Sequence, residues 1–171
     1  LFSKGVKFAF LEMSIHQPVP ELLQLNVAVY GVAEHGGVVA NKLVGTGAVG
    51  TSNQGYSVAL SADGNTAIVG GRFDDSALGA AWIFTRTNGV WTQQGSKLVG
   101  TGSVGSVLEQ GHSVALSADG NIALVGGPAD NFQSGAVWYF TRSAGVWTQD
   151  GSKVIGTGGS GRQGHSVALS L

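Results

Sequence analysis

Residues 57–65 read SVALSADGN, residues 113–121 read SVALSADGN again, and residues 166–170 open the same phrase a third time as SVALS. The first two copies are separated by 56 residues, as are Tyr56 and His112 just before them. The step from His112 to His165 is 53 residues, because a glycine-rich stretch is shorter there. A period of this length predicts a chain built from repeated structural units.

Each period contains four short runs that are rich in residues with a high strand propensity. In the first period these runs are SVALSA from Ser57, TAIVGG from Thr66, GAAWIFTR from Gly79 and VWTQQGSKLVG from Val90. Gly, Asn, Asp and Ser stand at the boundaries between them, as is typical of turns. The sequence therefore predicts four antiparallel strands in each repeat.

The third run is apolar on both faces. In GAAWIFTR, Trp82 and Phe84 alternate with Ala81 and Ile83, so neither face of the strand is suited to water. Four-stranded sheets that are covered on both sides and repeat at this spacing favour an all-β fold made of β-propeller blades. The chain holds about two and a half such repeats, with starts near residues 56, 112 and 165, which is an incomplete ring.

The first 41 residues match the repeats poorly. The stretch NVAVYGVAEHGGVVANKLVG from Asn26 reads as a degenerate copy of the third and fourth strands, and we interpret it as a partial blade. The opening residues lack the basic start and uninterrupted apolar run of a signal peptide. We expect residues 42–171 to form the recognisable repeats.

Composition restricts the classes of function. The chain is 43% hydrophobic and 11% charged, its formal net charge is −1, and it has no cysteine. A basic surface for nucleic acid is therefore not expected, and neither is a disulfide framework or a thiolate metal site. No apolar run approaches the roughly 18 residues of a membrane-spanning helix.

The repeats resemble the FG-GAP family, the bacterial relatives of the integrin α-subunit propeller. The resemblance covers roughly residues 42–171 and is carried by QGYSVALSADGNTAIVGG, QGHSVALSADGNIALVGGPAD, and the pair GAAWIFTR...GVWTQQG and GAVWYFTR...GVWTQDG. It implies a propeller with an interaction role, extracellular or at the cell surface.

Two departures from the family pattern are evident. The Phe-Gly of the family appears as Gln-Gly at Gln54, Gln110 and Gln163. The calcium loop between the first two strands is reduced to Ala-Asp-Gly-Asn, at 62–65 and 118–121. Calcium takes 6 to 8 oxygen ligands, so we expect tight Asp-Gly turns and no cofactor.

Residues that could carry chemistry recur with the period, which favours a structural role for them. His112 and His165 occupy the position of Tyr56, which cannot act as an imidazole base. The recurring tryptophans predict packing between blades, and a sugar-stacking surface at Trp91 and Trp147 is the alternative. The same recurrence marks several charged pairs as scaffold: Asp63 with Asp119, Asp74 with Asp130, Arg86 with Arg142, and Lys97 with Lys153.

The copies diverge mainly in the loops that join the second strand to the third and one blade to the next. In antiparallel blades these loops share one rim, and variable loops on a rigid scaffold are where binding residues usually lie. The predicted polar contacts are Arg72, Asp74, Asp75, Glu109, Asp130, Asn131 and Arg162, and the predicted apolar anchors are Phe73 and Phe132. Asp74 and Asp75 are also the remaining candidates for a weak cation site.

These observations favour a non-catalytic module that binds a protein or glycan ligand through this rim, without nucleic-acid binding or membrane insertion. A lectin-like carbohydrate-binding module and a part of a propeller enzyme are the alternatives. Propellers close with 4 to 8 blades. Two and a half blades are too few to close a ring, so we expect a fragment of a longer protein; self-association into a ring and another compact β fold are the alternatives.

Overall fold

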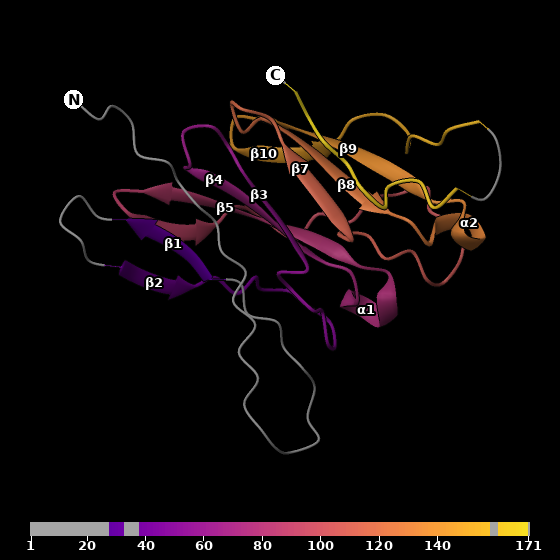
Figure 1. The fold of residues 1–171 in the computed structure, drawn as a ribbon, viewed down its shortest axis with the longest axis horizontal. Coiled ribbons are helices and arrows are strands. Elements are labelled where there is room, and N and C mark those ends of the chain that lie inside the picture. The colour runs from indigo at the N-terminus through magenta and orange to yellow at the C-terminus, as the bar shows by residue number, and fades with distance from the viewer. Residues whose placement is uncertain (1–27, 33–37, 158–160, 171) are drawn as a thin grey trace, which may run out of the picture.

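The computed structural model describes residues 28–32, 38–157 and 161–170, which form ten strands and two single helical turns (Figure 1). The strands are β1 Ala28–Val32, β2 Val38–Lys42, β3 Ser57–Leu60, β4 Thr66–Gly71, β5 Ala80–Thr87, β6 Val90–Gln93, β7 Ser113–Leu116, β8 Ile122–Gly127, β9 Ala136–Ser143 and β10 Val146–Gln149. The turns are α1 Asp74–Ala77 and α2 Asp130–Gln133.

The two full repeats form two four-stranded antiparallel sheets, in the orders β3-β4-β5-β6 and β7-β8-β9-β10. The all-β class and the four strands per repeat are confirmed. Each first strand ends at Leu60 or Leu116, before the serine that the sequence placed inside it. That serine opens a turn instead: Ser61 N–H donates to the carbonyl of Thr66, at 2.9 Å.

The fourth strand is shorter than the sequence predicts. β6 ends at Gln93, and Gly95 then adopts a φ of 75°, a value that favours glycine. The chain returns to the sheet at Leu98, whose N–H donates to the Ala81 carbonyl at 2.7 Å. The predicted run 90–100 is therefore one strand followed by a turn and an isolated bridge.

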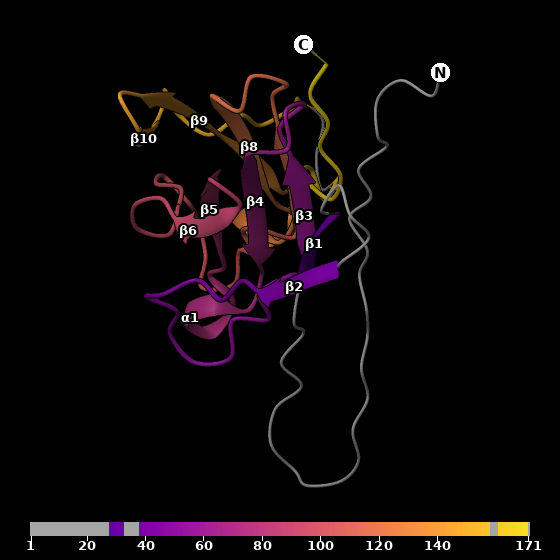
Figure 2. The same ribbon diagram turned by 90° about the vertical axis from the view of Figure 1, so that its left-hand side faces the viewer.

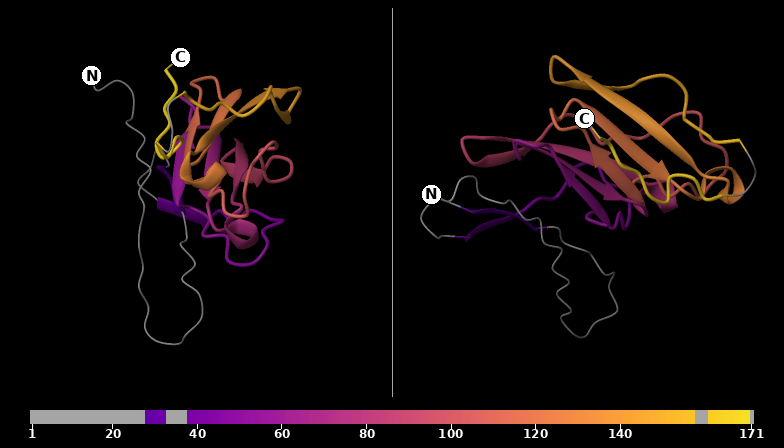
Figure 3. Two further views of the ribbon diagram at one scale, coloured as in Figure 1. Left: turned by 90° about the vertical axis from the view of Figure 1, so that its right-hand side faces the viewer. Right: turned by 45° about the horizontal axis from the view of Figure 1, so that its top comes forward.

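The main core lies between the two sheets, which are stacked in the right-hand view of Figure 3. Ile68 and Ile83 of the first sheet meet Val125, Trp138 and Phe140 of the second, and all five side chains are at most 3% exposed. The period-two alternation of the strands turns one face of each toward the other. Burial of this apolar area is the principal stabilising term.

A second core covers the other face of the first sheet. Trp82, Phe84 and Val69 lie there with Leu43, at most 8% exposed. Trp82 and Trp138 are both fully buried, which confirms core packing for this pair. Each indole N–H donates to a loop carbonyl, that of Thr46 at 2.9 Å or Thr101 at 2.8 Å, so neither buried donor is left unsatisfied.

Of the N-terminal segment, the structure describes the antiparallel hairpin of β1 and β2, in which Tyr30 pairs with Ala40. The hairpin lies beside the first sheet, on the side away from the second (Figures 2 and 3). Two paired strands here accord with a partial blade, which stays a prediction. Residues 1–27 lie outside the described part of the chain.

Candidate functional site

α1 and α2 lie at the same end of the two sheets (Figure 1) and have an unusual backbone. Three consecutive residues in each turn have φ between 48° and 70°, which is the left-handed region: Asp75, Ser76 and Ala77 in α1, and Asn131, Phe132 and Gln133 in α2. Left-handed backbone costs a non-glycine residue roughly 1–2 kcal/mol. Because the same strained conformation occurs in both repeats, other contacts must hold each loop in it.

A buried aspartate at the start of each turn supplies the first of these contacts. Asp74 Oδ1 accepts a hydrogen bond from Val49 N–H, and Asp130 Oδ1 accepts one from Val104 N–H, both at 2.8 Å. The second oxygen of Asp74 pairs with Lys97, and that of Asp130 with Lys153. Both aspartates are 0% exposed, so the two turns have the same ionic anchor.

Backbone hydrogen bonds supply the second set of contacts. Asn131 N–H donates to the Val104 carbonyl at 2.8 Å, and Gly135 N–H donates to the Asp130 carbonyl at 2.9 Å. The corresponding bonds in the first repeat join Asp75 to Val49 at 2.9 Å and Gly79 to Asp74 at 2.8 Å. The frame of the rim loop is therefore the same in both repeats, although the sequences at its tip differ.

The placement of Asp74 and Asp130 corrects their assignment as polar ligand contacts. Each carboxylate points inward because it satisfies a loop N–H and a lysine, and no part of the residue reaches the surface. Both carboxylate oxygens of Asp74 are therefore engaged within the protein. The predicted weak cation site, formed by Asp74 and Asp75 together, does not form. The recurrence of Asp74 with Asp130, and of Lys97 with Lys153, correctly marked them as scaffold.

The tips of the two turns are exposed and carry different side chains. The first presents Asp75 and Ser76, whereas the second presents Asn131 and Phe132. Phe132 is 84% exposed, the largest value among the exposed large hydrophobic residues of the described chain. Exposed apolar residues beside the tips were missed from the sequence, namely Val49, Val104 and Val107, at 45–50% exposed. They lie in glycine-rich stretches whose composition predicts a loop and gives no sign of a contact surface.

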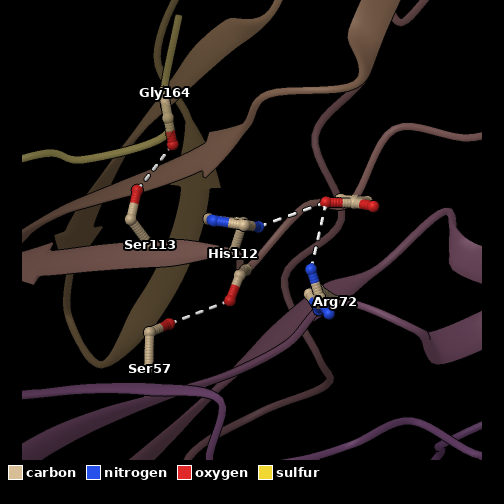
Figure 4. A network of polar contacts seen from close by, with 7 residues as sticks. Ser57, Arg72, His112, Ser113 and Gly164 are labelled. Carbon is tan, nitrogen blue, oxygen red and sulfur yellow. Dashed lines mark hydrogen bonds and ion pairs between the residues drawn. The ribbon is translucent and has the colours of Figure 1, made fainter. Parts of the chain in front are cut away.

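Arg72 lies at the same end of the first sheet and forms a local cluster. Its guanidinium lies 4.1 Å from the ring centre of Tyr56 and 4.3 Å from that of Phe73. Its Nη1 is 3.5 Å from Glu109 Oε2 (Figure 4), and its Nε is buried without a hydrogen-bond partner. The structure thus brings together three predicted rim residues, Arg72, Phe73 and Glu109.

His112 completes this cluster. Its Nδ1 lies 3.1 Å from Glu109 Oε2, and its ring centre lies 5.0 Å from that of Tyr56 and 4.6 Å from that of His165. Burial lowers the pKa of His112, and the nearby His165 and Arg72 act in the same direction, while Glu109 opposes them. The three repeat-equivalent rings therefore lie in a row from one repeat to the next, with neighbouring ring planes tilted by 54° and 48°.

Arg162 is exposed beside the second rim loop. Its N–H donates to the carbonyl of Gln133 at 3.0 Å, as Glu109 N–H donates to Ala77 at 3.0 Å in the first repeat. The segment that leaves each sheet is thus hydrogen-bonded to the rim loop of that sheet. The predicted site residues other than Asp74 and Asp130 reach the surface at this end, fully or in part.

The Asp-Gly turns on the opposite side of the repeat are held by their own side chains. Asp119 accepts hydrogen bonds from Ser117 Oγ at 2.5 Å, Asn121 N–H at 3.0 Å and Asn121 Nδ2 at 3.0 Å. These bonds lower the pKa of Asp119 to about 2. Within the described residues, no group of three His, Asp or Glu side chains is placed to hold a metal ion.

The outer tryptophans are engaged within the protein. The Arg86 guanidinium lies 5.3 Å from the Trp91 ring centre, and that of Arg142 lies 5.4 Å from Trp147. Trp147 Nε1 also donates to Gln94 Oε1 at 3.0 Å. An arginine thus lies over each of the two rings, and the sugar-stacking alternative stays a prediction.

No protein-family model matches this sequence, and no curated protein matches it significantly. In the part of the chain that the structure describes, no helix is long and apolar enough to cross a membrane.

Proposed function

We propose that the chain is a non-catalytic interaction module, made of FG-GAP-like β-propeller blades, that binds a protein partner through the rim formed by α1, α2 and the segments beside them. One observation carries the proposal: two loops with the same anchors and the same left-handed backbone display different residues at their tips. A rigid frame with variable tips is the usual design of a binding surface.

The chemistry of the rim favours a protein over a sugar as the partner. The segments that carry the exposed Phe132 and Val104 adjoin, because Asn131 N–H donates to the Val104 carbonyl. Exposed aromatic and aliphatic side chains surrounded by polar residues are typical of the centre of a protein–protein contact. The buried Asp74–Lys97 and Asp130–Lys153 pairs hold the rim loops, which accords with a non-catalytic role.

The blade assignment is supported by the repetition of contacts between sheets. Ser57 Oγ donates to the Gly111 carbonyl at 2.8 Å, and Ser113 Oγ donates to the Gly164 carbonyl at 2.7 Å (Figure 4). Each first strand is thus joined to the start of the next repeat. By the family resemblance, we place the module outside the cell or at its surface.

The test compares two substitutions at one position. Phe132→Ala removes the ring but keeps a side chain in left-handed backbone, whereas Phe132→Gly also relieves the strain. We expect both to weaken partner binding at least tenfold. Only the glycine variant should gain stability, by about 0.5–1 kcal/mol.

The measurement is photo-crosslinking on cells of the organism that makes the protein, with a photoreactive residue in place of Gln133. The amount of each crosslinked protein is then compared between the wild type and the two Phe132 variants. A reactive residue at the exposed Thr148 is the control position. Partners captured equally from Gln133 in all three proteins would show that Phe132 does not contribute to their binding, which would contradict the proposal.

A further inference from the structure

α1 and α2 have the same backbone conformation, but their tips carry side chains of opposite character. Asp75 and Ser76 lie at the tip of α1, and Asn131 and Phe132 take the same two positions in α2. All four residues are exposed. The first tip is therefore small and acidic, whereas the second is large and apolar.

Backbone hydrogen bonds fix the order of the segments along the rim at α1. Asp75 N–H donates to the Val49 carbonyl at 2.9 Å, in the segment that precedes the first sheet. Glu109 N–H, in the segment between the two sheets, donates to the Ala77 carbonyl at 3.0 Å. α1 therefore lies between these two segments, and Asp75 is bonded to the outer one.

The same bonds recur at α2. Asn131 N–H donates to the Val104 carbonyl at 2.8 Å, in the segment between the sheets. Arg162 N–H, in the segment that follows the second sheet, donates to the Gln133 carbonyl at 3.0 Å. The exposed residues of the rim thus follow one order, from one end to the other: Asp75, Ser76, Val107, Val104, Phe132 and Arg162.

The charges at the two ends of this row are opposite. Asp75 and Arg162 are both exposed, and neither takes part in an ion pair with another described residue. Arg72, by contrast, is already paired with Glu109. A row with an acidic end, an apolar middle and a basic end is complementary to its own copy turned by 180°.

We propose that the rim binds a second copy of this chain in a symmetric dimer, whose twofold axis passes between α1 and α2 at right angles to the row. α1 of each copy then faces α2 of the other. Asp75 pairs with Arg162 of the second copy at both ends of the contact, and the ring of Phe132 lies over the small Ser76. The inference rests on the proposed function, because it names the partner of the same rim.

Sedimentation velocity over a range of protein concentrations measures the dimer. Asp75→Arg and Arg162→Asp each place like charges opposite one another at both ends of the contact, so each should raise the Kd of the dimer at least tenfold. The double variant D75R/R162D exchanges the two charges and should restore the Kd to within about threefold of the wild type. Asp150→Arg changes an exposed charge outside the rim loops and is the control, with an unchanged Kd.

An equal mixture of the two single variants tests the symmetry of the contact. In the mixed dimer the two introduced charges face each other, and so do the two native charges. We therefore expect the mixture to associate like the wild type, although each variant alone associates weakly. Melting temperatures show that every variant is folded.

Three results would each overturn the proposal: a monomer at every concentration, a dimer that the single charge reversals leave unchanged, and a mixture that associates no better than its components. A dimer that is insensitive to the reversals would use another surface, such as the faces of the sheets. A monomeric chain whose Gln133 crosslinks to other proteins depend on Phe132 would overturn this inference and leave the proposed rim function intact. Crosslinks that do not depend on Phe132 would contradict the rim function itself.

Discussion

The side chain of Gln110 binds both backbone groups of Gly100. Its Oε1 accepts a hydrogen bond from Gly100 N–H at 2.6 Å, and its Nε2 donates to the Gly100 carbonyl at 3.0 Å. Gln54 holds Gly45 in the same way, at 2.6 and 2.9 Å. Glutamine thus has a definite role at the position where the FG-GAP family, which the repeats resemble, has phenylalanine: it secures the segment that leads out of the preceding sheet.

Gln110→Ala should destabilise the fold strongly. Gln110 is 0% exposed and Gly100 is buried, so the substitution leaves a backbone donor and an acceptor unsatisfied away from water. Each such group costs about 1–3 kcal/mol, and we expect a loss of about 2–4 kcal/mol in the free energy of unfolding. Urea denaturation measures it.

The matched control is Gln163→Ala. Gln163 makes the same pair of bonds to Gly156, which is exposed, so water can replace them. We expect a loss below about 1 kcal/mol. Similar losses for both variants would show that burial of the bonded glycine is not what gives Gln110 its importance.

Asp130→Asn should loosen the second rim loop. The substitution keeps the shape of the side chain but leaves Lys153, whose side chain is 13% exposed, without its partner charge. Breaking a buried ion pair costs about 3–5 kcal/mol, and we expect the lower end. Amide hydrogen exchange at residues 131–135 should accelerate. Asp150→Asn, at an exposed position, is the control, and equal exchange rates in both variants would contradict the anchoring role.

Stability should fall below pH 6.5 partly through His112. Its folded-state pKa is lowered, so the unfolded chain binds more protons, and the stability present above pH 6.5 is lost as the pH falls through the lowered value. His112→Tyr keeps a ring between Tyr56 and His165 but removes this titration. Melting temperatures from pH 8 to pH 5 should decline less in the variant, and parallel curves would exclude the effect.

Ser117→Ala should raise the pKa of Asp119. The Ser117 hydroxyl is the largest of the causes that lower this pKa from 3.8 to about 2. The stability gained from the lowered pKa is present above pH 3.8 and is lost as the pH falls toward 2. Carboxyl NMR titration should show a higher pKa in the variant, with Asp150 as the internal reference. An unchanged value would assign the shift to the two Asn121 bonds.

The strands could be predicted because the same short sequences recur, and because alternate side chains along each of them point to opposite faces of a sheet. SVAL and TAIVGG appear as β3 and β4 almost as expected, and the burial of Trp82 follows from its place in an apolar run. The excursion after Gln93 could not be predicted, since VWTQQGSKLVG reads as continuous strand and only Gly95 marks the turn.

The rim was predicted in position but not in detail. Divergence between the copies pointed to the loops that carry Phe73 and Phe132. Sequence alone could not show that Asp74 turns inward, because the Val49 N–H that it satisfies lies 25 residues away. Asp74 recurs as Asp130 at the repeat period, whereas the residues at the loop tips do not recur. This recurrence was the sequence signal that distinguishes the anchoring aspartates from the exposed tip residues.

The bonds from Ser57 to Gly111 and from Ser113 to Gly164 have a genetic consequence. Every residue on either side of these joints belongs to the repeating unit itself, so an in-frame duplication of 56 codons would produce a longer chain whose new joint is already complementary. A gene of this kind can gain or lose whole repeats in a single recombination event. Later substitutions then need to change only the residues at the loop tips.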